Sequence, residues 1–329
     1  MKVRVFFLWA MVIVLTTTAA NAVFAQPRVI KGIYYIKQTD RNYCGPAALA
    51  MLMNYWSKEK RYNQLEIVDA IFDKNKKVVY NSDMVYYAKQ EGLICYSFNS
   101  NIQELKLLID KGIPLIVLQK PIKQINKGHY RVVFGYDDDK GVFILHDPLI
   151  GANRGMKYKD FQELWNFGDN ANRQNWTLAV FPKDKELPFP ELKDNYIYHI
   201  NMATAYYRKK NYQDSIAEWE WAIEKCQDDP LPYPYYCLAQ VLLDIDRTDE
   251  AIKYALKAVE IDHKNPFAYD VLGLAYNKNG MIMEATETMA KAAKLRKKEH
   301  SFILKHWLKI RDKYINIFKK EKNKDEGEW

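Results

Sequence analysis

The second half of the chain repeats itself, and this periodicity restricts the fold more than any other feature of the sequence. Ala203, Ala239 and Gly273 follow one another at intervals of 36 and 34 residues. The same intervals separate the members of three further sets: Ser215, Ala251 and Ala285; Trp219, Ala255 and Met289; Ala222, Ala258 and Ala292. A period near 34 residues predicts stacked units that bury their apolar faces only against one another.

Small residues alternate with large aromatic ones in these units, which is typical of helical hairpins, because a small side chain lets two helices approach closely. In period and residue pattern the segment resembles the tetratricopeptide repeat. The two additional residues of the longer interval fall in 228–234, which we expect to be a loop. We therefore predict an all-α solenoid of three repeats over residues 195–298, in which Trp219 fills the groove between two units.

A basic segment follows the repeats. Residues 299–329 are predicted to form a capping helix and a tail, because apolar residues recur there at helical spacing. Most of the excess positive charge of the chain, which is +8 overall, lies between Arg296 and Lys324. A basic tail can attract nucleic acid or anionic lipid, but no reading motif accompanies this one. We interpret it as a solvated helix face and expect no nucleic-acid partner.

The first residues have the order of a secretory signal peptide. Lys2 and Arg4 precede the apolar run Val5–Leu15, and small residues then lead to Ala25. We expect cleavage after Ala25, or alternatively after Ala22, and an exported protein of the periplasm or the extracellular space. The alternative is an uncleaved membrane anchor, because residues 5–25 carry no charge and about 20 residues suffice to cross a bilayer. Only in that case do we expect a membrane partner.

The amino-acid composition predicts a globular protein after the signal segment. The 329 residues are 48% hydrophobic and 27% charged, close to globular averages, which excludes a disordered or collagen-like chain. The only long uncharged apolar stretch is the N-terminal one, which excludes a polytopic membrane protein.

Residues 26–182 are predicted to form an α+β domain that folds alone. Helices come first, at residues 47–55, 83–91 and 102–111. Strands rich in Val, Ile, Leu and Phe follow, at residues 114–118, 130–136, 142–146 and 176–181. Residues 137–141 predict a hairpin turn between the two middle strands, and the proline-containing, charged residues 183–194 predict a linker.

Cys44 stands where a polar loop runs into an apolar helix, in the string Cys44-Gly45-Pro46-Ala47-Ala48. Proline fits the first turn of a helix, where its missing N–H costs nothing. Cys44 should therefore face the positive end of the helix dipole. That position favours the thiolate, the form that attacks a carbonyl carbon.

Three other residues could serve such a nucleophile. His129 opens an apolar strand and could act as its base, while Asp147 ends the following strand, so that strand pairing would set its carboxylate beside the imidazole. The backbone N–H of Cys44 and the side-chain amide of Gln38 are candidate donors to an oxyanion. His146 would point to the opposite face of its strand from Asp147, and we interpret it as structural.

At these residues the chain resembles the bacteriocin-processing, double-glycine-leader family of papain-like cysteine peptidases. The resemblance covers about residues 30–182 and rests on a Gln six residues before a Cys-Gly-Pro-Ala-Ala helix start, a Gly-His that opens a strand, and an Asp-Pro that ends the next strand. It implies that Cys44 is the nucleophile, His129 the general base and acid, Asp147 the orienting group and Gln38 the oxyanion donor. Members of that family process leader peptides as the first domain of an ATP-driven exporter, whereas this sequence carries no G-x-x-x-x-G-K-[ST] phosphate loop.

The sequence thus predicts a papain-like cysteine peptidase domain followed by a tetratricopeptide-repeat solenoid, with a peptide or protein as substrate and a protein partner on the repeats. We expect no cofactor and no metal, since the four cysteines form no C-x-x-C pair. Four alternatives stay open: a catalytically silent scaffold or adaptor of the cell envelope, acyl transfer in place of hydrolysis, metal binding by Cys44, His129 and Asp147, and a disulfide between Cys226 and Cys237.

Overall fold

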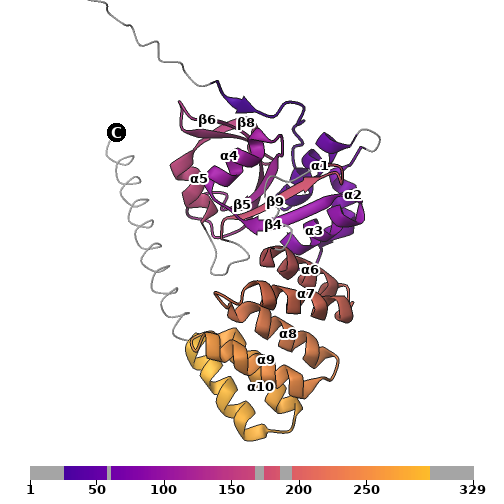
Figure 1. Ribbon diagram of the computed structural model, residues 1–329, viewed down its shortest axis with the longest axis vertical. Coiled ribbons are helices and arrows are strands. Elements are labelled where there is room, and N and C mark those ends of the chain that lie inside the picture. Colours follow the sequence, from indigo (N-terminus) through magenta and orange to yellow (C-terminus); the bar gives the residue numbers. More distant parts are fainter. Residues whose placement is uncertain (1–25, 58–60, 167–173, 186–194, 297–329) are drawn as a thin grey trace, which may run out of the picture.

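The computed structural model describes residues 26–57, 61–166, 174–185 and 195–296. A mixed domain with a central sheet is followed by a column of helices (Figure 1). The predicted signal peptide, residues 1–25, and the predicted capping helix and tail, residues 299–329, lie outside the described residues, as does most of the predicted linker. Across the described ranges no helix has the length and apolar character needed to cross a membrane.

An antiparallel sheet forms the centre of the first domain (Figure 1), with the strand order β4-β9-β5-β6-β7-β8 and with β1 paired to β6. Its strands are β1 (Arg28–Val29), β4 (Ile94–Asn99), β5 (Leu115–Gln119), β6 (His129–Asp137), β7 (Val142–Asp147), β8 (Gly151–Lys157) and β9 (Trp176–Phe181). A separate ribbon pairs β2 (Phe72–Asp73) with β3 (Val78–Val79). Every residue of β5 and β9 is buried, so the core of the domain lies around these two strands.

Helices surround this sheet: α1 (Cys44–Trp56), α2 (Gln64–Ile71), α3 (Asn81–Gln90), α4 (Ile102–Asp110) and α5 (Tyr158–Trp165). The first ten residues of α1 are all buried, because this helix packs against the sheet on one side and against α2 and α3 on another. A capping box starts α4: Asn101 accepts backbone hydrogen bonds through its side chain, and Glu104 accepts one from the Asn101 N–H. In α1 the apolar sequence matches the buried position of the helix, and in α4 the capping residues of the sequence mark its observed start.

The predicted α+β class is confirmed, but the predicted order, with helices first and strands after, is wrong. Strand β1 precedes α1, the β2–β3 ribbon precedes α3, and α5 lies between β8 and β9. β4 lies between α3 and α4, and it pairs with β9 at the edge of the sheet. Polar residues interrupt its apolar pattern, and Ser97 is nevertheless fully buried. Its burial depends on the first repeat, since Asn201 Nδ2 donates a hydrogen bond to Ser97 Oγ at 3.1 Å.

The second half of the described chain is helical throughout. It contains α6 (Tyr196–Arg208), α7 (Tyr212–Lys225), α8 (Pro232–Asp244), α9 (Thr248–Ile261), α10 (Pro266–Lys278) and a further helix over residues 282–296. These form three stacked hairpins, and the alanines and the serine of the repeating small positions are buried. A Cβ on Gly273 would lie 2.7 Å from Met289 Cγ, so the crossing helix leaves no room for a side chain there. An α+β domain followed by an all-α repeat solenoid is therefore the architecture of this protein.

Trp219 fills the space between the first two repeats. Its side chain in α7 is 2% exposed, and its ring meets that of Tyr233 in α8 edge-on, with centroids 5.7 Å apart.

Trp219→Ala should lower the free energy of unfolding by about 3 to 5 kcal/mol, because burial is lost and a cavity remains. Trp221→Ala is the matched control, since Trp221 lies on the same helix but is 46% exposed, and it should cost less than about 1 kcal/mol. Urea unfolding monitored by circular dichroism measures both, and an unchanged stability of Trp219→Ala would contradict the repeat register.

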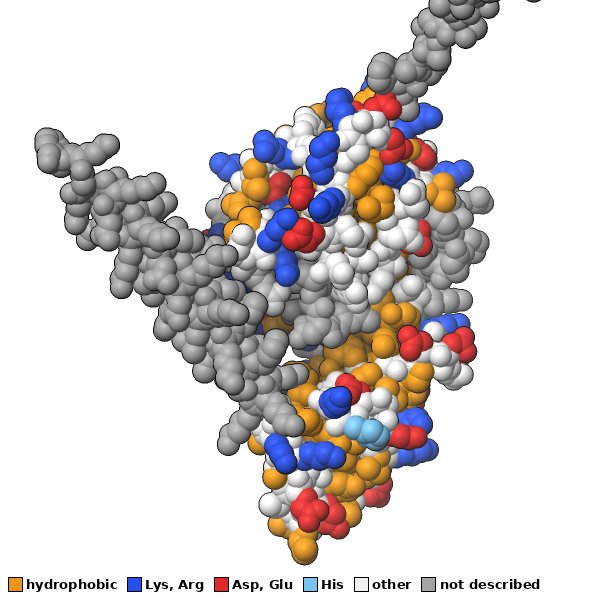
Figure 2. Space-filling view, turned by 90° about the vertical axis from the view of Figure 1, so that its left-hand side faces the viewer, with side chains coloured by type: hydrophobic (Ala, Val, Ile, Leu, Met, Phe, Trp, Pro, Cys, Tyr) orange, Lys and Arg blue, Asp and Glu red, His pale blue; other side chains and the backbone are white. Residues whose placement is uncertain are grey.

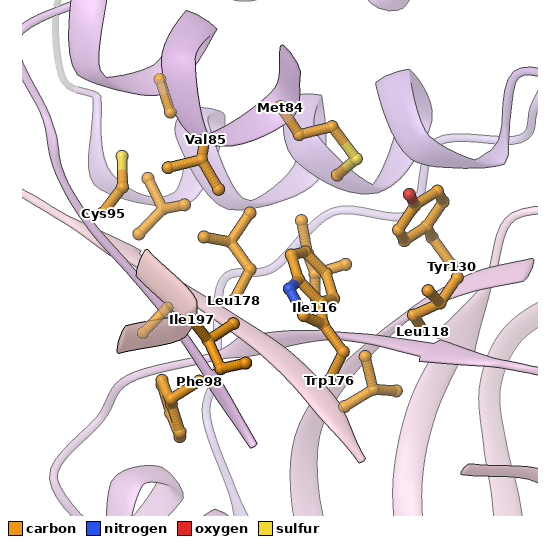
Figure 3. Close-up of a cluster of buried hydrophobic side chains, with 14 of the residues drawn as sticks. Met84, Val85, Cys95, Phe98, Ile116, Leu118, Tyr130, Trp176, Leu178 and Ile197 are labelled. Carbon is orange, nitrogen blue, oxygen red and sulfur yellow. The ribbon is translucent and has the colours of Figure 1, made fainter. Parts of the chain in front are cut away.

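The first repeat packs directly onto the sheet domain. Figure 3 shows Ile197 of α6 within one cluster with Cys95 and Phe98 of β4 and Leu178 of β9. The helix contacts both α3 and β4, so one continuous core joins the two parts. This shared core argues against the expectation that residues 26–182 fold alone, which stays a prediction to be tested on fragments of the chain.

Charged and aromatic groups line the rim of this junction. Arg208 of α6 pairs with Asp73 at 3.4 Å and with Asp83 at 3.3 Å, and its guanidinium lies 3.9 Å from the centre of the Tyr80 ring. Tyr206 meets Tyr86 of α3 edge-on, with ring centroids 5.7 Å apart. The junction therefore combines an apolar centre with a paired polar rim, as domain cores do.

Candidate active site

Cys44 is the first residue of α1 and is 7% exposed. A turn delivers the chain into the helix, since the N–H of Tyr43 donates to Asp40 O at 3.0 Å and the N–H of Asn42 donates to Asp40 Oδ1 at 3.0 Å. Pro46 lies in the first turn, where the backbone N–H groups have no intrahelical acceptors. The thiol therefore lies at the positive end of the helix dipole, as predicted.

Gly45 allows the sheet to approach the start of α1 closely. A Cβ at this position would lie 3.1 Å from Met84 Sδ and 3.1 Å from a ring carbon of Tyr130. Both neighbours are buried, so neither side chain can give way freely. Since Tyr130 follows His129 in β6, this close contact brings the head of β6 up to the residue after Cys44.

His129 and Asp147 lie side by side because they occupy the ends of paired strands. His129 opens β6, Asp147 closes β7, and His129 Nε2 lies 2.8 Å from Asp147 Oδ1. The Cys44 thiol lies close enough to the imidazole to contribute to the raised pKa of His129. Since Nε2 faces Asp147, Nδ1 is the ring nitrogen that remains for the thiol. The structure thus brings together three side chains that the sequence singled out in three separate segments.

The surroundings of the pair favour a charged imidazole and a charged carboxylate. Burial lowers the pKa of His129, but its hydrogen bond with Asp147 and its interaction with Cys44 outweigh this effect and raise the pKa above its ordinary value. Burial raises the pKa of Asp147, but His129 and Arg131 hold it well below the usual range of a carboxyl. Asp147 is therefore ionised at neutral pH, and its charge favours the protonated form of His129.

Arg131 completes this buried cluster, although it is absent from the predicted set of site residues. It lies two residues after His129, on the same face of β6, and is 1% exposed. A charged residue within an apolar strand was the sequence signal that could have revealed it, because arginine is seldom fully buried without a partner. Its guanidinium donates four hydrogen bonds, to Asp147 Oδ2 (2.7 Å), Gln119 Oε1 (3.1 Å), Lys120 O (3.0 Å) and Pro121 O (3.0 Å).

Gln38 lies next to the carboxylate end of this cluster and is buried. Its backbone N–H donates to the carbonyl of Pro148, the residue after Asp147, at 3.0 Å. Its side-chain Nε2 donates one hydrogen to Asp40 O at 2.7 Å, and its Oε1 has no hydrogen-bond partner within the described part of the chain. The amide nitrogen keeps a second hydrogen, so the role of Gln38 as an oxyanion donor stays a prediction.

Comparison with known protein families finds a match in the first part of the chain. Residues 30–175 match the model of the Peptidase_C39 like family. We refer to the first domain, which contains this match, as Peptidase_C39-like. No curated protein sequence matches the chain.

Among solved structures, the chain is similar to the peptidase domain of Streptococcus ComA, a bifunctional ABC transporter involved in quorum sensing, at 21% identity and a TM-score of 0.36. That match covers 46% of this chain and 100% of the ComA domain. The chain is also similar to MamA at 24% identity, with a TM-score of 0.31 and 33% of this chain covered. It spans 62% of the length of that MamA chain. A further match is YrrB, a tetratricopeptide-repeat protein with an unusual peptide-binding site, at 22% identity and a TM-score of 0.29, which covers 32% of this chain and 54% of that one.

The second buried histidine of the Peptidase_C39-like domain has a different environment. His146 Nε2 donates to Ile33 O at 3.1 Å, and its Nδ1 accepts from the N–H of Asn153 at 3.1 Å. Burial lowers the pKa of His146, with an opposing contribution from the hydrogen bond to Ile33. Both ring nitrogens are therefore used by backbone groups, and His146 of β7 links the N-terminal arm, residues 30–43 between β1 and α1, to β8.

The other cysteines are free thiols in less reactive surroundings. Cys226 and Cys237 are not bridged, so the disulfide alternative is not realised in this structure. Burial raises the pKa of Cys95 and of Cys226, and it raises the pKa of Cys237 to about 12. In the described ranges no three His, Cys, Asp or Glu side chains are grouped so that they could hold a metal ion.

Proposed function

We propose that this protein is an exported cysteine peptidase in which Cys44, His129 and Asp147 act as a catalytic triad. The observation that carries the proposal is the grouping of these three side chains at the start of α1, where His129 Nε2 lies 2.8 Å from Asp147 Oδ1 and the Cys44 thiol interacts with the imidazole. The group lies in the domain that matches the Peptidase_C39 like family. The residue types, their order and the helix dipole at the thiol are those that nucleophilic acyl transfer needs.

In this mechanism the proton of Cys44 moves to His129 and leaves a thiolate–imidazolium pair. The thiolate sulfur attacks the peptide carbonyl carbon, and the electron pair of the C=O bond moves to the oxygen, where the backbone N–H of Cys44 and the amide of Gln38 can donate hydrogen bonds. His129 then protonates the leaving amine, which leaves a thioester on Cys44. Next, His129 removes a proton from water, the resulting hydroxide attacks the thioester, and the thiol is restored as the acid product leaves. Asp147 stays ionised throughout and holds the ring.

The repeats suit the recruitment of a protein substrate or partner. Figure 2 shows hydrophobic side chains gathered over the repeats on one face of the molecule, whereas charged side chains spread over the sheet domain. Exposed apolar side chains of the repeats include Trp221, Leu256, Phe267, Leu274 and Ile282. Exposed apolar groups of this kind are typical of surfaces that bind other proteins. Export is supported by the order of residues 1–25, which is that of a signal peptide.

A peptidyl inhibitor that alkylates thiols tests the proposal. The chain from residue 26 to 329 should take up one equivalent, and peptide mapping should place it on Cys44. Burial raises the pKa of the other three thiols, so these are poor competitors. Cys44→Ala should not be labelled, whereas the matched control Cys95→Ala should be labelled at the wild-type rate if it folds. Absence of labelling in the wild-type protein under reducing conditions would contradict the proposal.

Two further measurements, the phenotype of Cys44→Ala in the native host and the analysis of products formed with an added amine, separate the alternatives. A silent scaffold requires that Cys44→Ala and the wild type give the same phenotype in the native host, with no peptide turned over by either. Acyl transfer requires that an added primary amine appear in the product in place of water. Hydrolysis by the wild type without amine incorporation supports the peptidase.

A further inference from the structure

The cluster around His129 contains a fourth charged residue, Arg131, whose place follows from the strand pairing. Val132 of β6 pairs with His146 of β7, and continuing this register by one residue sets Arg131 opposite Asp147. His129 and Arg131 are two residues apart and share one face of β6. The carboxylate of Asp147 therefore lies between two cationic partners, with Oδ1 on His129 and Oδ2 on Arg131 Nε at 2.7 Å.

Both members of the Arg131–Asp147 pair are withdrawn from water, with side chains 1% and 2% exposed. A buried guanidinium is tolerated only when its N–H groups find acceptors. Here the remaining acceptors are neutral oxygens at the end of β5 and just beyond it: the Gln119 side chain and the carbonyls of Lys120 and Pro121. These anchor the guanidinium independently of Asp147, so Arg131 holds the carboxylate from a fixed point of the sheet.

The charge of Arg131 opposes that of Asp147 at the imidazole. Asp147 raises the pKa of His129 and Arg131 lowers it. The other titratable group that faces the ring is Cys44 on α1. Gln119 of β5, which pairs with His129 across the sheet, carries no charge, and Tyr35 of the N-terminal arm is close enough to Asp147 to interact with its charge. Arg131 thus weakens the effect of the Asp147 charge on the ring, while the pKa of His129 stays above its ordinary value.

We propose that Arg131 is a positioning residue of the active site, which fixes Asp147 with Oδ1 toward His129 and places a second cationic group on the same carboxylate. The catalytic role of Arg131 rests on the proposed peptidase function, whereas its test is a titration of His129 that needs no peptidase activity. The imidazole must give its proton to the leaving amine, and a base that is too strong does so poorly. Arg131 would then let the domain use a charged aspartate without overstabilising the imidazolium.

Titration of His129 by NMR in the chain from residue 26 to 329 tests the inference without turnover. In a Cys44→Ala background, where the thiol contributes nothing, Arg131→Met should raise the pKa of His129 by about 1 unit, the size of shift that one nearby charge produces. Arg131→Lys keeps the charge and should shift the pKa by less than half as much. His146 is an internal control, because both its ring nitrogens bond to backbone groups elsewhere, and its pKa should stay unchanged.

A double variant keeps the test decisive if Arg131→Met does not fold. Arg131→Met leaves the buried carboxylate without its cation, whereas Arg131→Met combined with Asp147→Asn leaves no unpaired charge. The double variant should therefore have a higher melting temperature than the single one. An unchanged His129 pKa in folded Arg131→Met, or a double variant no more stable than an unfolded single one, would overturn the inference. Failure of wild-type Cys44 to react would instead contradict the peptidase and leave the titration result standing.

Discussion

Replacing His129 with glutamine should lower kcat/KM on a peptide substrate by about 10³- to 10⁴-fold and remove most alkylation of Cys44 at neutral pH. Glutamine is close to histidine in size and can still donate to Asp147 Oδ1, which His129 Nε2 contacts at 2.8 Å. It cannot take the thiol proton, so no thiolate–imidazolium pair forms. It also cannot protonate the leaving amine, so the loss should appear in kcat rather than in KM. Steady-state kinetics and the rate of inhibitor uptake measure the two effects separately.

His146→Gln is the matched control for this experiment. His146 lies on the neighbouring strand and is equally buried, but its ring nitrogens bond only to Ile33 O and to the N–H of Asn153. Its replacement should lower the melting temperature and leave kcat within about tenfold of the wild type, because no proton moves through it. Equal losses of kcat in the two variants, or a His129→Gln enzyme within tenfold of the wild type, would contradict the role of His129.

The juxtaposition of the candidate triad could be predicted because each member occupies the end of an element. Cys44 lies at a loop-to-helix boundary, where Pro46 marks the start of the helix. His129 and Asp147 lie at the outer ends of two strands joined by a short turn, and antiparallel pairing brings such ends together. The local sequence was therefore enough to predict that these three side chains lie close together.

Arg131 and Gln119 could not be placed in the same way. Their burial depends on tertiary partners: the guanidinium is satisfied by β5 and the residues after it, and Gln119 Nε2 donates to Phe161 O of α5 at 3.0 Å. A sequence pattern shows that Arg131 interrupts an apolar strand, but not which oxygens will surround it. Buried polar clusters are set by the assembled fold, and single-strand periodicity does not describe them.

The same distinction holds for the fold. The repeats followed from the regular spacing of small residues such as Ala203 and Ala239, because each repeat contacts mainly its neighbours. β4 was missed because its burial depends on a helix about one hundred residues later in the chain, through the contact between Ser97 and Asn201. Non-local packing of this kind leaves no periodic pattern in the strand itself.

Removal of the repeats should unfold the Peptidase_C39-like domain instead of releasing it as a stable unit. In residues 26–185 the apolar face of β4 would lose α6, including the fully buried Ile197, and would expose Cys95 and Phe98. Each large apolar side chain moved from the core to water costs about 1.5 to 3 kcal/mol. The expected loss is on the order of 5 kcal/mol, which equals the entire stability of many domains. Circular dichroism and thermal unfolding of this fragment beside the chain of residues 26–329 measure the loss.

The fragment of residues 26–227 is the matched control, because it keeps α6 and α7 and removes only the later repeats. It should unfold cooperatively and retain alkylation of Cys44, since the core that α6 shares with β4 stays closed. A fragment of residues 26–185 that melts cooperatively within a few degrees of the full chain would show that the junction contributes little to stability. If instead only the longer fragment folds, the first repeat is needed for the stability of the sheet domain. A protein bound to the repeats is then held at a fixed orientation to Cys44.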